Sequence, residues 1–277
     1  MSNVFDVSAS GYYHWVNRKE SRRYRRKRSL QQEITVIYQE HNGYAGSPLI
    51  AEDLKSKEEF KDISRTRVAK EMKELKLRCK TRKKYTHTTD SSHKEPVAEN
   101  LLNREFTQER PNCAWVTDIT YLQVKSKWVY LVVFIDLFNR EVVGWDVSES
   151  LKTESSIYAF NKAVNKKNPP SGLMVHSDRG VQYASQDFRC VLREHNCIQS
   201  MSRKGNCWDN AVAESFFSTL KKRLTRDRNY NSIEELKRDL FWYIEIYYNR
   251  YRKHSANNWI SPADKLLYYF EELRNCA

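Results

Sequence analysis

Three short apolar segments at hairpin spacing constrain the fold of this chain more than any other feature. They run over residues 115–124, 128–135 and 141–147; Lys125-Ser126-Lys127 separates the first two, and residues 136–140, which include Phe138-Asn139-Arg140, separate the last two. Apolar segments of this length with such short connections are typical of antiparallel strands joined as a meander. The sequence therefore predicts a three-stranded sheet at the beginning of a core.

Helices and strands alternate after this meander. Residues 157–164 have apolar side chains at helical spacing, and residues 173–175 form a short buried strand. Ser185 caps a second helix, and residues 198–201 are predicted to form another strand. The order β-β-β-α-β-α-β-α predicts an α/β fold, in which a mixed sheet of a three-strand meander plus crossover units is flanked by helices.

The residues ahead of this core are helical and basic. Ser29 with Gln32 forms a capping box, Ser47 caps a second helix that has Pro48 at its first position, and Ser64 caps a third. Three short helices with a basic last one match a helix-turn-helix DNA reader, and an ordinary helical bundle fits nearly as well. In the DNA reader, the third helix presents Arg65 and Arg67 to DNA.

A dense basic run, Arg22-Arg23-Tyr24-Arg25-Arg26-Lys27-Arg28, precedes these helices. Such a run is either a solvated face or a phosphate-binding arm, and the neighbouring helices favour the arm. A formal net charge of +13 also favours a nucleic-acid partner, because a basic surface attracts phosphate backbones. We therefore expect Arg22, Arg23, Arg25 and Arg26 to contact DNA.

These patterns divide the chain into five segments. They are a helical and basic arm at 1–28, a helix-turn-helix-like DNA-binding module at 29–78, a linker at 79–110, the core at 111–225 and a helical region at 226–277. The linker rests on the polar run Thr88-Thr89-Asp90-Ser91-Ser92, and a capping box of Ser232 with Glu235 begins a long helix in the last segment. Without a membrane-length apolar run or a signal segment, we expect a cytoplasmic protein with no membrane partner and with reduced cysteines.

Three carboxylates lie where a charge is costly or where ligands gather. Asp118 is inside an apolar strand, where a charge is expensive unless it is paired or bound to metal. Asp178 follows the strand at residues 173–175, and open α/β sheets bind ligands at such carboxyl ends. Glu214 is on a helix predicted to begin near Asp209, with 35 residues between it and Asp178.

Each acid alone has a structural explanation. Asp118 could pair with a lysine, Asp178 could cap the turn before Gly180, and Glu214 could face solvent. Together they suit Mg²⁺, a hard cation that prefers oxygen ligands. Two such ions about 3.5–4 Å apart can clamp both oxygens of a phosphoryl displacement. We therefore expect two Mg²⁺ ions in the active site, with Mn²⁺ as a substitute.

The helix of Glu214 also carries Asn210, Ser218 and Lys221 on the same face. This polar stripe indicates a helix that lines a site, and a solvent-facing stripe is the alternative.

The segments around these residues are distinctive. They are Trp115-x-Thr-Asp118-Ile-Thr-Tyr121, Asp136-Leu-Phe-Asn-Arg140, His176-Ser-Asp178-Arg-Gly180, Asn206-Cys-Trp-Asp209-Asn210-Ala-Val-Ala-Glu214 and Tyr248-Asn249-Arg250. This set resembles the ribonuclease-H-like catalytic domain of DDE transposases and retroviral integrases. More narrowly, it resembles the second reading frame product (OrfB) of the insertion sequence 3 family, over nearly the whole chain.

The resemblance implies a DNA transposase with metal-dependent cleavage at the element ends and strand transfer by a 3′ hydroxyl. In this interpretation Asp118 bridges both ions, and Asp178 and Glu214 each hold one. Further roles are implied for residues nearby: Lys221 and Asn210 face DNA beside the cut, and Arg203 and Lys204 hold backbone phosphates. His176 either supports the metal ligands from behind or is a buried neutral histidine. Trp208 either stacks on a flipped base or packs in the core.

The implied partners are double-stranded DNA, as terminal inverted repeats and as target, and further copies of the chain on paired ends. Fusion or association with an upstream OrfA product is also implied. Phe5, Tyr13 and Trp15 lack an obvious cover within the chain, which is typical of a contact surface.

Two other classes fit parts of the sequence. One is a helix-turn-helix regulator with an inert nuclease-like domain, which would lack metal-dependent strand transfer. The other is a recombinase with a tyrosine or serine nucleophile, which would form a covalent protein–DNA adduct.

If the run from Arg22 to Arg28 holds phosphates, replacing its arginines with glutamine should weaken binding to all DNA sequences alike. The slope of the logarithm of the binding constant against the logarithm of the salt concentration should fall in magnitude by about 0.9 for each phosphate that the protein no longer neutralises. Fluorescence anisotropy over a salt series, with end-containing and unrelated duplexes, measures both effects. Loss of binding to only one of the two DNA sequences would show that the basic run contacts bases instead.

Overall fold

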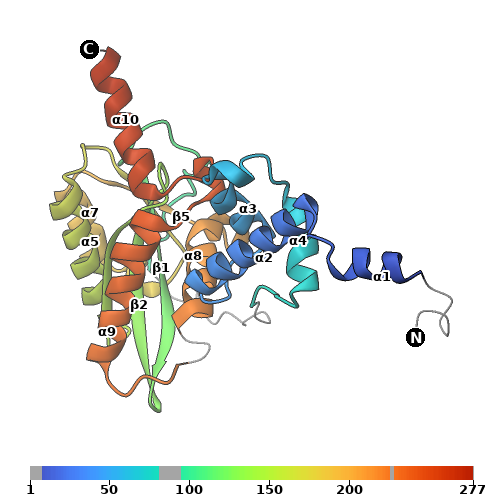
Figure 1. The fold of residues 1–277 in the computed structure, drawn as a ribbon. Coiled ribbons are helices and arrows are strands. Elements are labelled where there is room, and N and C mark those ends of the chain that lie inside the picture. Colours follow the sequence, from blue (N-terminus) through green and yellow to red (C-terminus); the bar gives the residue numbers. More distant parts are fainter. Residues whose placement is uncertain (1–7, 81–94, 225–227, 277) are drawn as a thin grey trace. The chain divides into compact units, whose positions relative to one another are not determined.

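The chain forms two compact units, Met1–Thr81 and Arg82–Ala277, in a computed structural model (Figure 1). The structure describes residues 8–80, 95–224 and 228–276. We call Met1–Thr81 the N-terminal unit and Arg82–Ala277 the core unit. Thr88–Ser92, the predicted centre of the linker, lie outside the described residues.

The N-terminal unit is all-helical. Its elements are α1 (Ala9–Val16), α2 (Arg22–Glu40), α3 (Ser47–Lys55), the short 3₁₀ helix η2 (Glu58–Phe60) and α4 (Arg65–Glu74). Residues Ile34, Ile50, Leu54 and Val68 from α2, α3 and α4 are fully buried together. Three packed helices that end in a basic one confirm the predicted helical module.

The beginning of α2 differs from the prediction. Ser21 caps the helix by accepting a hydrogen bond from the Tyr24 N–H, so Ser29 lies inside the helix and caps nothing. Arginine and lysine are good helix formers, which lets the basic run form the first two turns. The run is therefore part of α2 and not a separate arm. Likewise Gly46, not Ser47, caps α3, whereas Ser64 caps α4 as predicted.

The core unit is built on a five-stranded sheet in the order β3-β2-β1-β4-β5. The strands are β1 (Ala114–Val124), β2 (Lys127–Asp136), β3 (Val142–Ser148), β4 (Met174–Ser177) and β5 (Ile198–Met201). The first three are antiparallel neighbours, and β4 and β5 continue the sheet in parallel with β1. The predicted ribonuclease-H-like mixed sheet is confirmed, with β1 as its middle strand.

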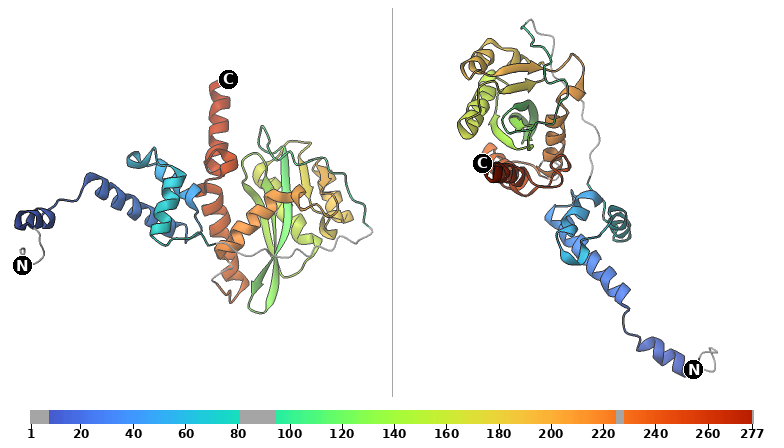
Figure 2. Two further views of the ribbon diagram at one scale, coloured as in Figure 1. Left: turned by 90° about the vertical axis from the view of Figure 1, so that its right-hand side faces the viewer. Right: turned by 90° about the horizontal axis from the view of Figure 1, so that it is seen from above.

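Helices cover both faces of this sheet (Figure 2). They are α5 (Thr153–Lys167), α6 (Val181–Ala184), α7 (Gln186–Glu194), the 3₁₀ helix η3 (Cys207–Asn210), α8 (Ala211–Leu224), α9 (Ile233–Phe241), the π-helix η4 (Trp242–Tyr251), the 3₁₀ helix η5 (Ser255–Asn257) and α10 (Pro262–Cys276). Ser185 and Ser232 cap α7 and α9, as predicted. Among the described residues, no helix is long and apolar enough to cross a membrane.

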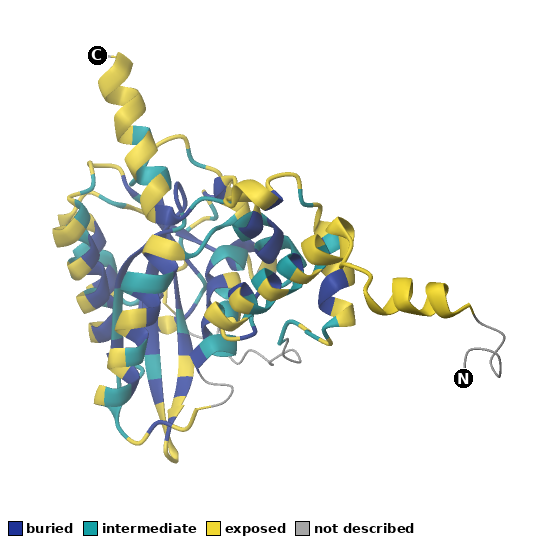
Figure 3. Ribbon diagram, in the orientation of Figure 1, coloured by how far each residue is buried: buried dark blue, intermediate teal, exposed yellow. Residues whose placement is uncertain are grey.

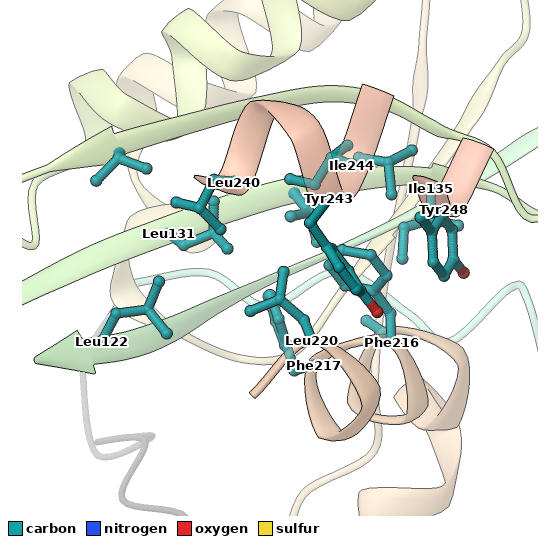
Figure 4. Packing of buried hydrophobic residues seen from close by; sticks show 14 of the residues in the cluster. Leu122, Leu131, Ile135, Phe216, Phe217, Leu220, Leu240, Tyr243, Ile244 and Tyr248 are labelled. Carbon is teal, nitrogen blue, oxygen red and sulfur yellow. The ribbon is translucent and has the colours of Figure 1, made fainter. Parts of the chain in front are cut away.

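Side chains alternate along the strands, so each face of the sheet has its own core. Val116 and Leu122 of β1 pack with α8, α9 and η4, as Figure 4 shows for Leu122, Phe216, Leu220 and Tyr243. Trp115 of the same strand packs with α5 and α7 on the opposite face. The buried residues of the strands and the inner helix faces stand out in Figure 3.

The α5 face of the sheet depends on one glycine. A Cβ atom at Gly144 of β3 would meet the Ala159 carbonyl oxygen at 2.5 Å and the Ala163 Cβ at 2.7 Å. Because contacts this short do not occur, a side chain at position 144 would push α5 away from the sheet.

Part of the predicted linker belongs to the core unit. Leu102 is buried in the core on the α8 face of the sheet, and the N–H groups of Leu101 and Leu102 donate to Ser200 Oγ of β5. The polar composition of residues 95–110 therefore reflects a segment that binds the sheet edge through hydrogen bonds, and not a free connection. The other predicted domain boundaries stay predictions.

Candidate active site

Asp118 lies in the middle strand of the sheet with its side chain on the α8 face. It has the same strand parity as Val116 and Leu122, which pack against α8. The residue is only 9% exposed, and its Oδ1 accepts a hydrogen bond from the Ile119 N–H at 2.8 Å. The sequence prediction of an acid inside a core strand is thus confirmed.

Strand pairing brings Asp178 level with Asp118. In the parallel pair of β1 and β4, Val116 lies opposite His176, and each acid follows two residues later. Asp178 is half-buried, and its Oδ1 accepts a hydrogen bond from the Gly180 N–H at 3.0 Å. The turn that fixes Asp178 was foreseen as an alternative to a functional role, and it serves here to orient one oxygen.

Helix α8 brings Glu214 and Lys221 to the same place. Its apolar residues Phe216, Phe217 and Leu220 pack on the sheet, and Glu214 is in its first turn. Burial, the charge of Asp178 and the charge of Glu214 all raise the pKa of the Asp118 carboxyl well above its ordinary value. Lys221 acts in the opposite direction. The four predicted residues therefore act on one another electrostatically.

The same negative field extends to the other face of β1. Tyr183 is fully buried there, with its hydroxyl 2.9 Å from Thr117 Oγ1. Burial, and then the charges of Asp118 and Asp178, raise its pKa well above the ordinary value. In the part of the chain that the structure describes, however, no three His, Cys, Asp or Glu side chains converge into a ready metal cage.

His176 of β4 connects its strand to β5 and to the residue that follows β5. Its ring is fully buried, with Nδ1 2.8 Å from Ser200 Oγ and Nε2 3.2 Å from Ser202 Oγ. Burial lowers its pKa to about 4, so the ring is neutral at neutral pH. This favours the buried neutral histidine of the two alternatives.

Sequence reasoning assigned no role to Asp209, which organises the beginning of α8. Its buried carboxylate accepts hydrogen bonds at 2.8 Å from Arg203 Nε and Nη2, from Arg104 Nε and from Asn100 Nδ2. These ion pairs hold the pKa of Asp209 far below its ordinary range. Arg203 therefore binds Asp209, and its predicted role as a phosphate ligand is not supported by its geometry. No spacing rule connects residues 100–104 with Asp209, so the sequence carries no local signal for this cluster.

Asn210, for which the family resemblance implied a DNA-facing role, is buried. It is 4% exposed, and its Nδ2 donates to the Thr117 carbonyl oxygen at 3.1 Å. The amide ties the start of α8 to β1 beside Asp118, because a strand carbonyl faces it. This is a positioning role that periodicity alone does not distinguish from a solvent-facing one.

Trp208 is 69% exposed, so packing in the core is excluded and stacking on a base stays a prediction. Lys204 is also exposed.

Of the residues predicted to contact DNA in the N-terminal unit, some are exposed and others interact with residues of the same unit. Arg22, Arg23, Arg25 and Arg65 are exposed. Arg26 is also exposed and donates to the Glu59 carbonyl oxygen at 3.3 Å. Arg67 forms a 2.8 Å ion pair with Glu71, which is fully buried, so this arginine stabilises α4 first.

The core unit is a meander-first mixed sheet with Asp118 in its middle strand β1 and Asp178 directly after β4, as expected for an integrase core. Family comparison agrees: residues 108–207 and 195–262 match integrase core domain families, and residues 25–85 match an HTH-like domain. An insertion element IS600 protein of 31 kDa from Shigella sonnei is 40% identical, over 95% of this chain and 96% of that protein. Transposase InsF for insertion sequence IS3A, from Escherichia coli (strain K12), is 34% identical over 95% of this chain and 91% of its own length. The chain therefore belongs to the insertion sequence 3 family of transposases.

Among solved structures, a simian T-cell lymphotropic virus intasome in complex with a PP2A regulatory subunit is similar at 15% identity. The match covers 84% of this chain and 74% of that one, with a TM-score of 0.49. At this distance no residue role transfers.

The raised pKa of Asp118 has a consequence for stability. The folded chain binds this proton more tightly than the unfolded chain, so the contribution is present at low pH and is lost as pH rises through the raised pKa. Asp118→Asn should therefore be more stable than the wild type at about pH 7 in EDTA, and the difference should shrink towards about pH 4. Each tenfold difference between the acid constants of Asp118 in the folded and unfolded chain changes the free energy of unfolding by about 1.4 kcal/mol.

Urea unfolding followed by tryptophan fluorescence measures this difference, because six of the seven tryptophans lie in the core unit. Glu154→Gln, at an exposed acid in the first turn of α5, is the matched control and should lower stability only slightly, because it removes a negative charge near the helix N-terminus. Equal or lower stability of Asp118→Asn at neutral pH would contradict the electrostatic account.

Proposed function

We propose that this chain cuts DNA at the ends of an insertion sequence and joins the freed ends to new DNA, as a polynucleotidyl transferase of the DDE type. The observation that carries the proposal is the buried Asp118 carboxylate, which lies in the middle strand beside two further acids of like charge. Relatives named as transposases over 95% of the chain support the same activity.

Asp118, Asp178 and Glu214 are proposed to hold two Mg²⁺ ions, with Mn²⁺ as a substitute. Three carboxylates are hard oxygen donors and suit these ions. Like charges repel until a cation neutralises them, so the proposal requires the three side chains to close around the ions. The charges of Asp178 and Glu214 both raise the pKa of Asp118, so Asp118 would be the ligand that the two ions share.

The metal supplies Lewis acidity for a phosphoryl displacement. Water first breaks the P–O bond at the element's end, which leaves a 3′ hydroxyl. That hydroxyl then attacks a second phosphodiester, so that one P–O bond forms as another breaks and no bond to the protein is made. Lys221 is proposed to hold the scissile backbone, and Asn210 and the Asp209 cluster to keep α8 in register with β1.

The proposed partners are the element's terminal inverted repeats, target DNA, further copies of the chain and an upstream OrfA product. The match to an HTH-like domain supports DNA binding by the N-terminal unit. A cytoplasmic location stays a prediction. An inert regulator is disfavoured because it has no need of a buried acid, Asp118, whose ionised form is destabilised by burial and by two neighbouring acids.

Asp118→Asn, Asp178→Asn and Glu214→Gln should each abolish cleavage and joining while DNA binding survives, because each removes one anionic metal ligand at nearly constant volume. Loss of several kcal/mol of transition-state stabilisation corresponds to a rate reduced roughly 10²–10⁴-fold. Cleavage and strand transfer on labelled end-containing DNA, with Mg²⁺, provide the readout. Glu154→Gln serves as the active control, and near-normal strand transfer by any of the three variants would remove that residue from the site.

The chain should assemble as a multimer on two DNA ends, because joining two ends requires both in one complex. Helix α1 supports this, since it buries none of its residues and exposes Tyr12, Tyr13 and Trp15. Phe5 lies outside the described residues. Light scattering with and without end-containing DNA tests the assembly. A monomer on a single end, under conditions where joining proceeds, would exclude it.

A further inference from the structure

The side of α8 turned away from Glu214 lines a pocket of about 240 Å³ in the core unit. Ser215 and Thr219 of α8 form one wall, and Arg140, Tyr248, Arg252 and His254 form the others. Tyr248 and Phe216 meet edge to face at 4.8 Å in this region, where Figure 4 shows both rings. The pocket and the acids thus share one helix but use different faces of it.

Two positive charges line this pocket. Arg140 belongs to the turn between β2 and β3, and burial lowers its pKa, yet it stays charged as arginines do. Arg252 donates from Nη1 to the His254 ring at 3.1 Å. Burial and the two arginines lower the pKa of His254 to about 2, so His254 is a neutral acceptor and adds no charge.

The positive charge of the pocket has no counter-ion of its own. In the described part of the chain, no carboxylate lies at ion-pair distance from Arg140 or Arg252. The charge of Asp136 acts on Arg140, but the carboxylate oxygens of Asp136 accept from the N–H groups of Phe138 and Asn112. Arg140 Nη1 is buried with no hydrogen-bond partner. An unsatisfied buried donor on a cation is costly, so the site favours an anion.

The walls of the pocket are held in place before any ligand arrives. Asn249 joins η4 to β3, because its Oδ1 accepts from the Val142 N–H at 2.9 Å and its Nδ2 donates to the Val142 carbonyl oxygen at 3.0 Å. The Tyr248 ring lies between Phe216 and the His254 ring, at 4.8 and 4.7 Å. A π-helix such as η4 is itself frequent at functional sites.

We propose that this pocket binds one phosphate of a DNA backbone. Arginine side chains match the geometry of phosphate oxygens, and the Ser215 hydroxyl adds a neutral donor, whereas the Thr219 hydroxyl already donates to the Ser215 carbonyl oxygen at 3.0 Å. The volume suits a single tetrahedral anion, because sites for larger ligands typically measure about 300–1,000 Å³. The proposal rests on the proposed function for its DNA partner. It adds a phosphate anchor on α8 that is separate from the acids.

The first experiment needs neither DNA nor catalysis. Thermal unfolding of the full chain is measured with inorganic phosphate and with chloride at equal ionic strength. Phosphate should raise the Tm saturably for the wild type and for Asp118→Asn, and should do so far less for Arg252→Gln. Arg250→Gln is the matched control, because Arg250 is exposed two residues earlier and does not line the pocket. Thr219→Glu places a carboxylate opposite the arginines, and should raise the Tm and abolish the phosphate response.

The second experiment uses DNA ends with one neutral methylphosphonate at a time. In the wild type, a methylphosphonate at one position should reduce the affinity for DNA roughly tenfold. A methylphosphonate at the same position should have no effect on the affinity of Arg252→Gln. Arg252→Gln should also lower the salt slope by about 0.9, and Arg250→Gln should keep the position-specific effect.

An equal phosphate response in Arg252→Gln and the wild type, or the same methylphosphonate sensitivity in both, would overturn the proposal. Because the phosphate response is read on Asp118→Asn as well, a failure of the pocket is distinguishable from a failure of the catalytic assignment.

Discussion

The burial of one carboxylate in the middle strand is the constraint on which the core unit depends. Asp118 is surrounded by a sheet core, and burial together with two neighbouring acids makes its ionised form unfavourable. A fold that selects only for stability would place an apolar residue there. The cost is tolerated only by a rigid surrounding: β1 is paired on both sides, and α8 is anchored to it by packing and by the Asn210 amide. The buried Asp118 therefore reduces stability, and under the proposed function a bound cation would restore it.

Helix α8 is the element that the acids and the arginine pocket share. One face carries Glu214 and Lys221 towards Asp118, the apolar face packs on the sheet, and a third side lines the arginine pocket. Its start is fixed by the Asp209 cluster and its apolar face by the aromatic residues of η4. A displacement of α8 would therefore disturb the acids and the pocket together. This explains why the polar residues that fix the helix matter as much as those that face a substrate.

The sequence predicted the elements whose signals are local. Apolar runs with short turns identified β1, β2 and β3, and serine caps identified α4, α7 and α9. The cost of burying a charge identified Asp118, and its place at the end of a strand identified Asp178.

Prediction from the sequence failed where the deciding contact is distant in the chain. Asn210 is buried because its amide donates to a strand carbonyl 93 residues earlier. Arg203 binds Asp209, which Arg104 also binds. The helix start at Ser21 was missed because Ser29 offered an equally good cap, and helix propensity in the basic run decided between them.

Divalent metal is expected to relieve the repulsion around Asp118, and calorimetric titration with Mg²⁺ tests this central claim most directly. The full chain is titrated near pH 6 (about two units above a free carboxyl) in two buffers of different ionisation enthalpy, which reveals protons released on binding. We expect saturable binding with proton release in the wild type, and weaker binding without that release in Asp118→Asn. Equal affinity and equal proton release in both chains would contradict it.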